Sequence, residues 1–140
     1  MKKDIEFPLV EGVKVAIVKT INALSYPEWN AYIINRRAET LKNVLVSSKG
    51  YGEVNGEIIK TSVLRHVLGD LLPTQYALIE AIDPAVFKIS NEFWVSFYID
   101  QKIYDKKKIY DKKYIFLPET IIETNLIYIP ELAAEGVLHV

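Results

Sequence analysis

Several short stretches of the chain alternate between apolar and polar side chains. In residues 13–21, Val13, Val15 and Ile17 fall on one side of an extended chain, whereas Lys14 falls on the other. An alternation of period two is typical of a β-strand with one buried face. The same pattern recurs in residues 29–35, 41–49, 75–82, 93–99 and 114–117. It predicts about seven strands and no long helix.

One segment, residues 58–72, is ambiguous between strand and helix. It follows Asn55-Gly56, a dipeptide that favours the type I′ turn of a tight β-hairpin. Apolar residues also recur there at helical spacing behind Ser62, which could cap a helix. We prefer the strand because an alternation continues directly out of the turn, through Ile59, Thr61, Val63 and Arg65.

The kinds of apolar residue support a β-rich fold. Residues that favour strands comprise 18 Ile, 13 Val, 9 Tyr, 5 Phe and 2 Trp, against 13 Leu, 9 Ala and 1 Met. We therefore predict an all-β fold, an antiparallel immunoglobulin-like β-sandwich in residues 1–118 with a C-terminal extension in residues 119–140. The extension has too many apolar residues for a free end. It should pack on its own sandwich or, alternatively, add a strand to a second subunit.

Composition narrows the classes of function. A length of 140 residues suits one domain, and the absence of cysteine excludes disulfides, cysteine-bound metals and thiol nucleophiles. His66 and His139 are the two histidines, so we predict no metal site and no cofactor. With 17 basic and 18 acidic residues the net charge is −1, which gives no general attraction to nucleic acid. No export signal or apolar membrane span is recognisable, so we expect a cytoplasmic protein by elimination.

Candidate ligand-binding residues are Lys49, Tyr51, Arg65 and His66. Residues 47–52, SSKGYG, loosely resemble a phosphate-binding loop, but the lysine precedes the glycines and a hairpin follows. A bulge or a close approach of chains explains these glycines better, although backbone amides near Lys49 could hold a carboxylate or phosphate. Arg65 and His66 are neighbours in a strand and should point to opposite faces. No Ser–His–Asp triad can be argued, so the sequence does not predict an enzyme.

A hexad is repeated in tandem, as IYDKKK at 103–108 and IYDKKY at 109–114. The repeat predicts a lengthened hairpin, because inserting an even number of residues into a strand leaves every later side chain on its original face of the sheet. Residues 102–113 hold six lysines and two aspartates, a net charge of +4 in a chain of −1. Such a ribbon could bind an acidic protein or stack on single-stranded bases, but edge lysines also prevent aggregation. The candidate partner surface comprises Tyr104, Lys106, Lys107, Tyr110, Lys112 and Lys113.

Four segments give the chain a resemblance to a small Bacteroidetes-type bacterial family of unknown function. They are WNAYIIN at 29–35, VLVSSKGYG at 44–52, KTSVLRH at 60–66 and IYDKKYIF at 109–116. Proteins like these sometimes carry the label of a phenylalanyl-tRNA synthetase subunit. A synthetase core needs long helices and ATP-binding arginines, which one strand-rich domain does not supply. The order of segments also resembles immunoglobulin-like adhesion and scaffold sandwiches, which implies a fold but no activity.

Pattern and composition together predict a non-enzymatic domain that binds a protein partner. The binding surface would be an edge strand, the lysine-rich hairpin or the C-terminal tail. A binder of small anions or other small ligands is the first alternative, and a binder of single-stranded nucleic acid is the second. We expect no membrane association. A homodimer that forms through an edge strand or through the C-terminal tail is a further alternative.

Overall fold

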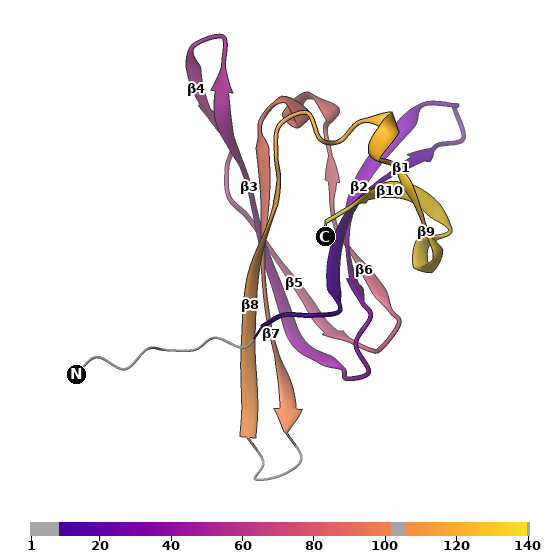
Figure 1. Ribbon diagram of the computed structural model, residues 1–140, viewed down its shortest axis with the longest axis vertical. Coiled ribbons are helices and arrows are strands. Elements are labelled where there is room, and N and C mark those ends of the chain that lie inside the picture. Colours follow the sequence, from indigo (N-terminus) through magenta and orange to yellow (C-terminus); the bar gives the residue numbers. More distant parts are fainter. Residues whose placement is uncertain (1–8, 102–105, 140) are drawn as a thin grey trace, which may run out of the picture.

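Two antiparallel β-sheets pack face to face in the structure, a computed structural model that describes residues 9–101 and 106–139 (Figure 1). The side chains of Gln101, Lys106 and Lys107 lie outside this description. The predicted antiparallel β-sandwich is confirmed. Within the described ranges, no helix has the length and apolar character needed to cross a lipid bilayer.

The first sheet has the strand order β6–β2–β1–β10–β9, and the second has the order β4–β3–β7–β8. In the second sheet, β5 also pairs with β3, so β4 and β5 follow one another along the same edge of that long strand. Three short 3₁₀ turns, η1, η2 and η3, complete the described elements. Their bounds are β1 Val13–Ile21, β2 Pro27–Asn35, β3 Leu41–Val54, β4 Glu57–Lys60, β5 Leu64–Leu71, β6 Tyr76–Ile82, η1 Pro84–Lys88, β7 Ser90–Gln101, β8 Lys106–Phe116, η2 Glu123–Asn125, β9 Ile127–Ile129, η3 Pro130–Leu132 and β10 Ala134–Leu138.

The strand interpretation of residues 58–72 is confirmed, because the segment forms β4 and β5. The turn before β4 is also confirmed: Asn55 and Gly56 have φ values of 53° and 80°, both in the left-handed region that this turn needs. The described residues form ten strands rather than about seven. The additional strands β4, β9 and β10 have three to five residues each, which is too short for an alternation to stand out.

The main core lies between the sheets and is built from alternate positions of their strands. In β1 these are Val13, Val15 and Ile17. Residues with the same orientation in the other strands include Ala31, Ile33, Val44, Val46, Phe93, Val95, Phe97, Tyr110, Tyr114 and Phe116. The two-residue period that predicted the strands therefore also identifies the sides that meet in the core.

The C-terminal tail docks on its own chain, which was the first of the two predicted outcomes. β10 pairs with β1, with Ile17 opposite Val137, and β9 extends the sheet beyond β10 (Figure 1). Gly136 permits this pairing, because a Cβ atom there would lie 2.7 Å from the Ile17 carbonyl oxygen. The tail also covers the outer side of the first sheet, where a second small core contains Ala16, Val18, Ile34 and Ile129.

The described part of the lysine-rich segment, residues 106–113, lies in β8 and pairs with β7 as one arm of the predicted hairpin, and residues 102–105 lie outside the described ranges. The β7–β8 pairing runs from Asn91 opposite Phe116 to Gln101 opposite Lys106. The second hexad, residues 109–114, lies wholly within β8. β8 is the last strand of its sheet, so one of its edges has no neighbouring strand among the described residues.

Candidate functional site

Two rows of side chains cross the side of the second sheet that faces away from the core. In the first row, Arg65 of β5, Ser47 of β3, Trp94 of β7 and Lys113 of β8 lie opposite one another in the strand register. The second row lies two residues further along each strand. We call the two rows together the outer-face patch: Arg65, Ser47, Trp94, Lys113, Val67, Leu45, Ser96 and Asp111.

Trp94 is central to the outer-face patch. It is 45% exposed, and Lys113 Nζ lies 4.8 Å from its ring centroid in a cation–π contact. Two hollows of about 350 and 190 Å³ adjoin it, and both Trp94 and Arg65 line each of them. Arg65 is exposed, and within residues 9–101 and 106–139 its guanidinium has no ion pair or hydrogen bond. An exposed tryptophan beside an arginine is typical of the residues that dominate binding energies.

Three of the four predicted ligand-binding residues, Lys49, Tyr51 and Arg65, share this outer face. A carboxylate of the protein already contacts the first two: Lys49 Nζ lies 3.7 Å from Glu92 Oε2, and the Tyr51 hydroxyl donates to Glu92 Oε1 at 3.2 Å. Burial and then the nearby Glu92 raise the pKa of Tyr51, which keeps the phenol protonated as a donor. Of these three residues, Arg65 is therefore the one whose positive charge is not already paired and can bind an external anion.

The fourth predicted residue, His66, points to the other side of β5, as the sequence led us to expect. Its Nε2 lies 3.0 Å from Glu80 Oε1, and the Ser48 hydroxyl donates to the same oxygen. We call Ser48, Glu80 and His66 the polar clasp, because it joins β3 and β5 of the second sheet to β6 of the first. The carboxylate lies between the hydroxyl and the imidazole, so the imidazole cannot take the hydroxyl proton as a Ser–His–Asp triad requires.

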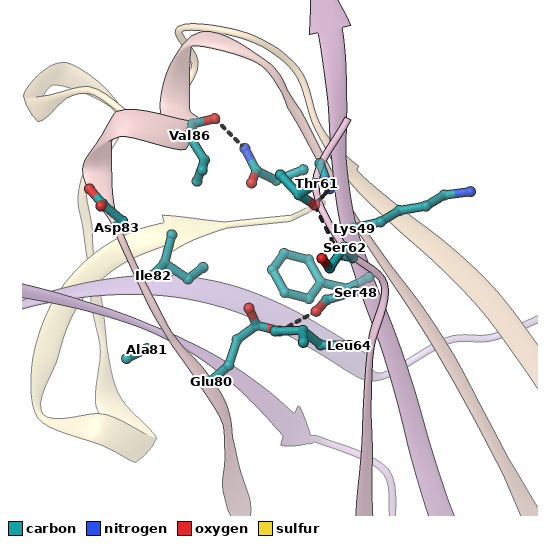
Figure 2. A pocket seen from close by; sticks show the side chains of 13 residues that line it. Ser48, Lys49, Thr61, Ser62, Leu64, Glu80, Ala81, Ile82, Asp83 and Val86 are labelled. Atoms are coloured by element: carbon teal, nitrogen blue, oxygen red, sulfur yellow. Dashed lines mark hydrogen bonds between the residues drawn. The ribbon is translucent and has the colours of Figure 1, made fainter. Parts of the chain in front are cut away.

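A pocket of about 200 Å³ lies beside the polar clasp, between the sheets and below η1 (Figure 2). Glu80 and Asn91 contribute polar groups to its lining, and Ile82 and Phe93 contribute apolar surface. Figure 2 shows the Lys49 side chain running away from the other labelled side chains. The lysine of the lining therefore does not place its charge in the pocket.

The glycines of residues 47–52 serve packing, as predicted. A Cβ atom on Gly50 would lie 2.9 Å from Ile89 Cδ1, and one on Gly52 would lie 2.9 Å from Ile89 Cγ2. The Gly50 amide donates to Thr61 Oγ1 at 2.7 Å. That amide is therefore committed to a hydroxyl of the protein and is not available to a phosphate.

The structure corrects one residue, Tyr110, of the partner surface that was predicted on the lysine-rich hairpin. Tyr110 is only 6% exposed and its ring stacks on Phe97 with centroids 5.2 Å apart, so it belongs to the core. Tyr114 is also fully buried. Residues two apart in a strand share a face, and here that face is the inside of the sandwich. These two tyrosines therefore cannot stack on bases or contact a partner.

The lysines of the same hairpin divide between the two faces of β8. Lys112 lies on the inner side, with Nζ 4.8 Å from the Tyr114 ring, whereas Lys113 lies on the outer side beside Trp94. Tyr104 and the side chains of Lys106 and Lys107 lie outside the described residues. Of the predicted partner surface, Lys113 is the residue that the structure places in the outer-face patch.

Trp94 and Glu80 were not among the site residues predicted from the sequence. The sequence held a signal for Trp94: it lies between the apolar residues Phe93 and Val95, and if these face the core, the alternation puts a large aromatic residue on the solvent side of β7. Glu80 carried no comparable signal, because its partners Ser48 and His66 are 32 and 14 residues away in the chain.

Across the part of the chain that the structure describes, no three histidine, aspartate or glutamate side chains gather in a way that could hold a metal ion. No family model matches the sequence. No curated protein matches it either. The outer-face patch and the pocket are therefore interpreted from their own chemistry.

Proposed function

We propose that this protein is a non-enzymatic interaction domain that binds an acidic segment of another protein on the outer-face patch. The observation that carries the proposal is the exposed Trp94 between Arg65 and Lys113. Tryptophan and arginine combine a large contact area with directional hydrogen bonding, and both are enriched among residues that dominate protein interfaces. A carboxylate from a partner would give Arg65 the ion pair that the described chain does not supply.

Charge favours an acidic partner over a basic one. The outer-face patch has two cations, Arg65 and Lys113, against one anion, Asp111. Lys113 also belongs to the window 102–113, whose net charge is +4. Complementary charge speeds encounter with a partner and disfavours partners of the wrong sign.

The shape of the surface favours a polypeptide over a small molecule. Small-molecule sites are usually enclosed, whereas the outer-face patch is one face of a sheet with two hollows beside a single aromatic anchor. Side chains at alternate positions of an extended segment could enter such hollows. Nucleic acid has less support, because Tyr110 and Tyr114 are buried and cannot stack on bases.

The proposal can be tested with a fluorescein-labelled decapeptide in which glutamate alternates with phenylalanine. We expect fluorescence anisotropy to rise with this peptide and not with the version that has lysine in place of glutamate. Trp94→Ala should weaken binding about tenfold or more, as expected for a hot-spot side chain. Arg65→Gln should weaken binding more at low salt than at high salt, because its contribution is electrostatic.

A matched control distinguishes a loss of binding at the outer-face patch from an effect of the net charge of the protein. Lys88→Gln, on η1, removes the same charge as Arg65→Gln but lies outside the outer-face patch. We expect it to change the affinity by less than about twofold, because a distant exposed charge is screened. Equal losses for the two variants, or unchanged binding by Trp94→Ala, would refute the outer-face patch as the site.

A further inference from the structure

We infer that the pocket of Figure 2 is a second binding site, which accepts a primary ammonium group carried on a short aliphatic chain. Both a lysine side chain of a partner protein and a small free amine have this chemistry. The pocket lies on the inner side of the second sheet, so it is separate from the outer-face patch. The inference rests on two polar groups in its lining, Glu80 and Asn91.

Glu80 offers the ligand one carboxylate oxygen. The contacts from Ser48 and His66 both go to Oε1, and no hydrogen bond to Oε2 occurs within residues 9–101 and 106–139. Figure 2 shows the Glu80 carboxylate directed into the space between Ile82 and Ser48. The Glu80 side chain is only 19% exposed, so water screens its charge weakly and a cation beside it would be attracted strongly.

Asn91 offers a second acceptor. It is 7% exposed, and its Nδ2 donates to the carbonyl oxygens of Val86 at 2.9 Å and Ile89 at 3.1 Å. These two bonds fix the orientation of the amide and leave Oδ1 without a hydrogen-bond partner in the described part of the chain. Asn91 Oδ1 is not among the buried atoms that lack a partner, so it faces accessible space and can accept a hydrogen bond from a ligand in the pocket.

The other polar groups of the lining do not supply a cation. Thr61 Oγ1 accepts from the Gly50 amide at 2.7 Å and donates to the Ser62 carbonyl at 3.1 Å, so it is already satisfied. Lys49 is directed away from the pocket and lies 3.7 Å from Glu92 on the outer face. The pocket thus presents acceptors and the Glu80 carboxylate, whose charge has no partner cation while His66 is neutral, and this combination selects a positively charged donor.

Size and apolar surface define the rest of the ligand. A volume of about 200 Å³ is below the range of about 300–1,000 Å³ that is usual for drug-sized ligands, so a short chain is expected. Ile82, Leu64 and Val86 would contact its methylene groups. The Phe93 ring, which also lines the pocket, could add a cation–π contact to the ammonium group.

The test is an NMR titration with two probes, N-acetyl-lysine methylamide and n-butylamine. The matched control is N-acetyl-norleucine methylamide, which has a similar aliphatic chain without the ammonium group. We expect saturable shifts of the Glu80 and Asn91 amide resonances with the two amines and none with the control. Glu80→Gln should weaken binding about tenfold or more, as expected for loss of a partly buried ionic contact. Glu53→Gln, an exposed carboxylate of β3 outside the pocket, should leave the affinity unchanged.

A second variant covers the case in which Glu80→Gln unfolds the protein by breaking the polar clasp. Ser62→Phe keeps Glu80 but places a ring at the pocket lining, and we expect it to abolish amine binding. Trp94→Ala should leave amine binding intact, which separates this inference from the function proposed above. Stronger binding of the lysine probe would indicate a partner protein, and stronger binding of butylamine a free amine. Equal binding of the norleucine control, full affinity in Glu80→Gln or Ser62→Phe, or no saturation by either amine would overturn the inference.

Discussion

At the scale of single residues, the buried hydroxyl of a tyrosine joins the two sheets. Tyr114 of β8 donates to the Val13 carbonyl of β1 at 2.6 Å, and the side chain is fully buried. Burial raises the pKa of Tyr114 well above its usual range, because the core disfavours the phenolate. The folded protein therefore keeps this proton at a pH where the unfolded chain loses it.

This difference predicts a loss of stability in alkali. Above the ordinary tyrosine pKa of about 10, the unfolded chain binds fewer protons at residue 114 than the folded chain, so the free energy of unfolding falls as pH rises. The slope from this residue approaches about 1.4 kcal/mol per pH unit. The Tyr114→Phe variant should lack this contribution to the pH dependence. At pH 7 its free energy of unfolding should be about 1 kcal/mol lower, because the hydrogen bond to the Val13 carbonyl is lost.

Denaturant unfolding of both proteins between neutral pH and about pH 11 measures the effect, with the window set by the ordinary tyrosine pKa. We expect the free energies of unfolding of the two proteins to converge as the pH rises above the ordinary tyrosine pKa. Curves that stay parallel over this range would mean that Tyr114 ionises as easily in the folded protein as in the unfolded chain.

At the scale of elements, β8 is an edge strand whose lysines protect it. Lys108 and Lys112 occupy inner-side positions, opposite Ile99 and Val95, and their ammonium groups lie 5.6 Å and 4.8 Å from the rings of Tyr110 and Tyr114. Inward-pointing charges on an edge strand prevent a second sheet from pairing with it, because pairing would bury them. The lysine-rich repeat therefore has a structural use that is independent of any partner.

Lys112→Val should make the protein more prone to aggregate. Removing the Lys112 charge makes the inner side of β8 apolar from Tyr110 to Phe116 and leaves Lys108 as the inward charge that remains, so edge-to-edge pairing between molecules becomes more favourable. Light scattering and thioflavin T fluorescence of concentrated protein at 37 °C would measure the lag time, which we expect to shorten several-fold. Lys113→Val is the matched control, since it changes the same charge on the same strand but on the outer face. Equal lag times for the two variants would contradict the protective role of the inner position.

At the scale of the whole molecule, the tail is held by packing and by two ion pairs, Lys19–Glu123 and Arg36–Glu131. Arg36, just after β2, contacts Glu131 of η3 through two bonds, Nε to Oε2 at 2.7 Å and Nη2 to Oε1 at 3.1 Å. The hydrogen bond from Arg36 lowers the pKa of Glu131. The folded state is therefore stabilised at pH values above the ordinary carboxylate pKa, and this stabilisation is lost as pH falls through the lowered value.

Glu131→Gln should lower the free energy of unfolding by about 1 kcal/mol at pH 7, the upper part of the range for exposed pairs because the contact is bidentate. The difference from the unmodified protein should shrink below about pH 4, where carboxylates become protonated. Urea unfolding at a series of pH values measures both effects. Glu135→Gln, an exposed carboxylate of β10, serves as the control and should have little effect. A difference that persists undiminished in acid would show that Glu131 acts by packing and not by charge.

The sequence by itself determined where the longer strands lie and which residues of each strand share a side. Residues 13–21 were predicted as a strand from their alternation, and the structure has β1 at Val13–Ile21. The Asn55-Gly56 turn was also predicted correctly from the sequence, because its conformation depends on those two residues alone. The position of a strand, and the set of its residues that share a side, follow from local preferences and a two-residue period, so neither depends on the partner strands.

The tertiary structure alone decided which of these faces meet. It placed Tyr110 inside the sandwich, Trp94 outside beside Arg65, and the tail on β1 of its own chain. It also brought Glu80 to Ser48 across 32 residues of sequence. Such contacts depend on strand order and register between distant segments, and an alternating pattern is compatible with many orders and both directions of facing. The outer-face patch and the pocket are products of that pairing.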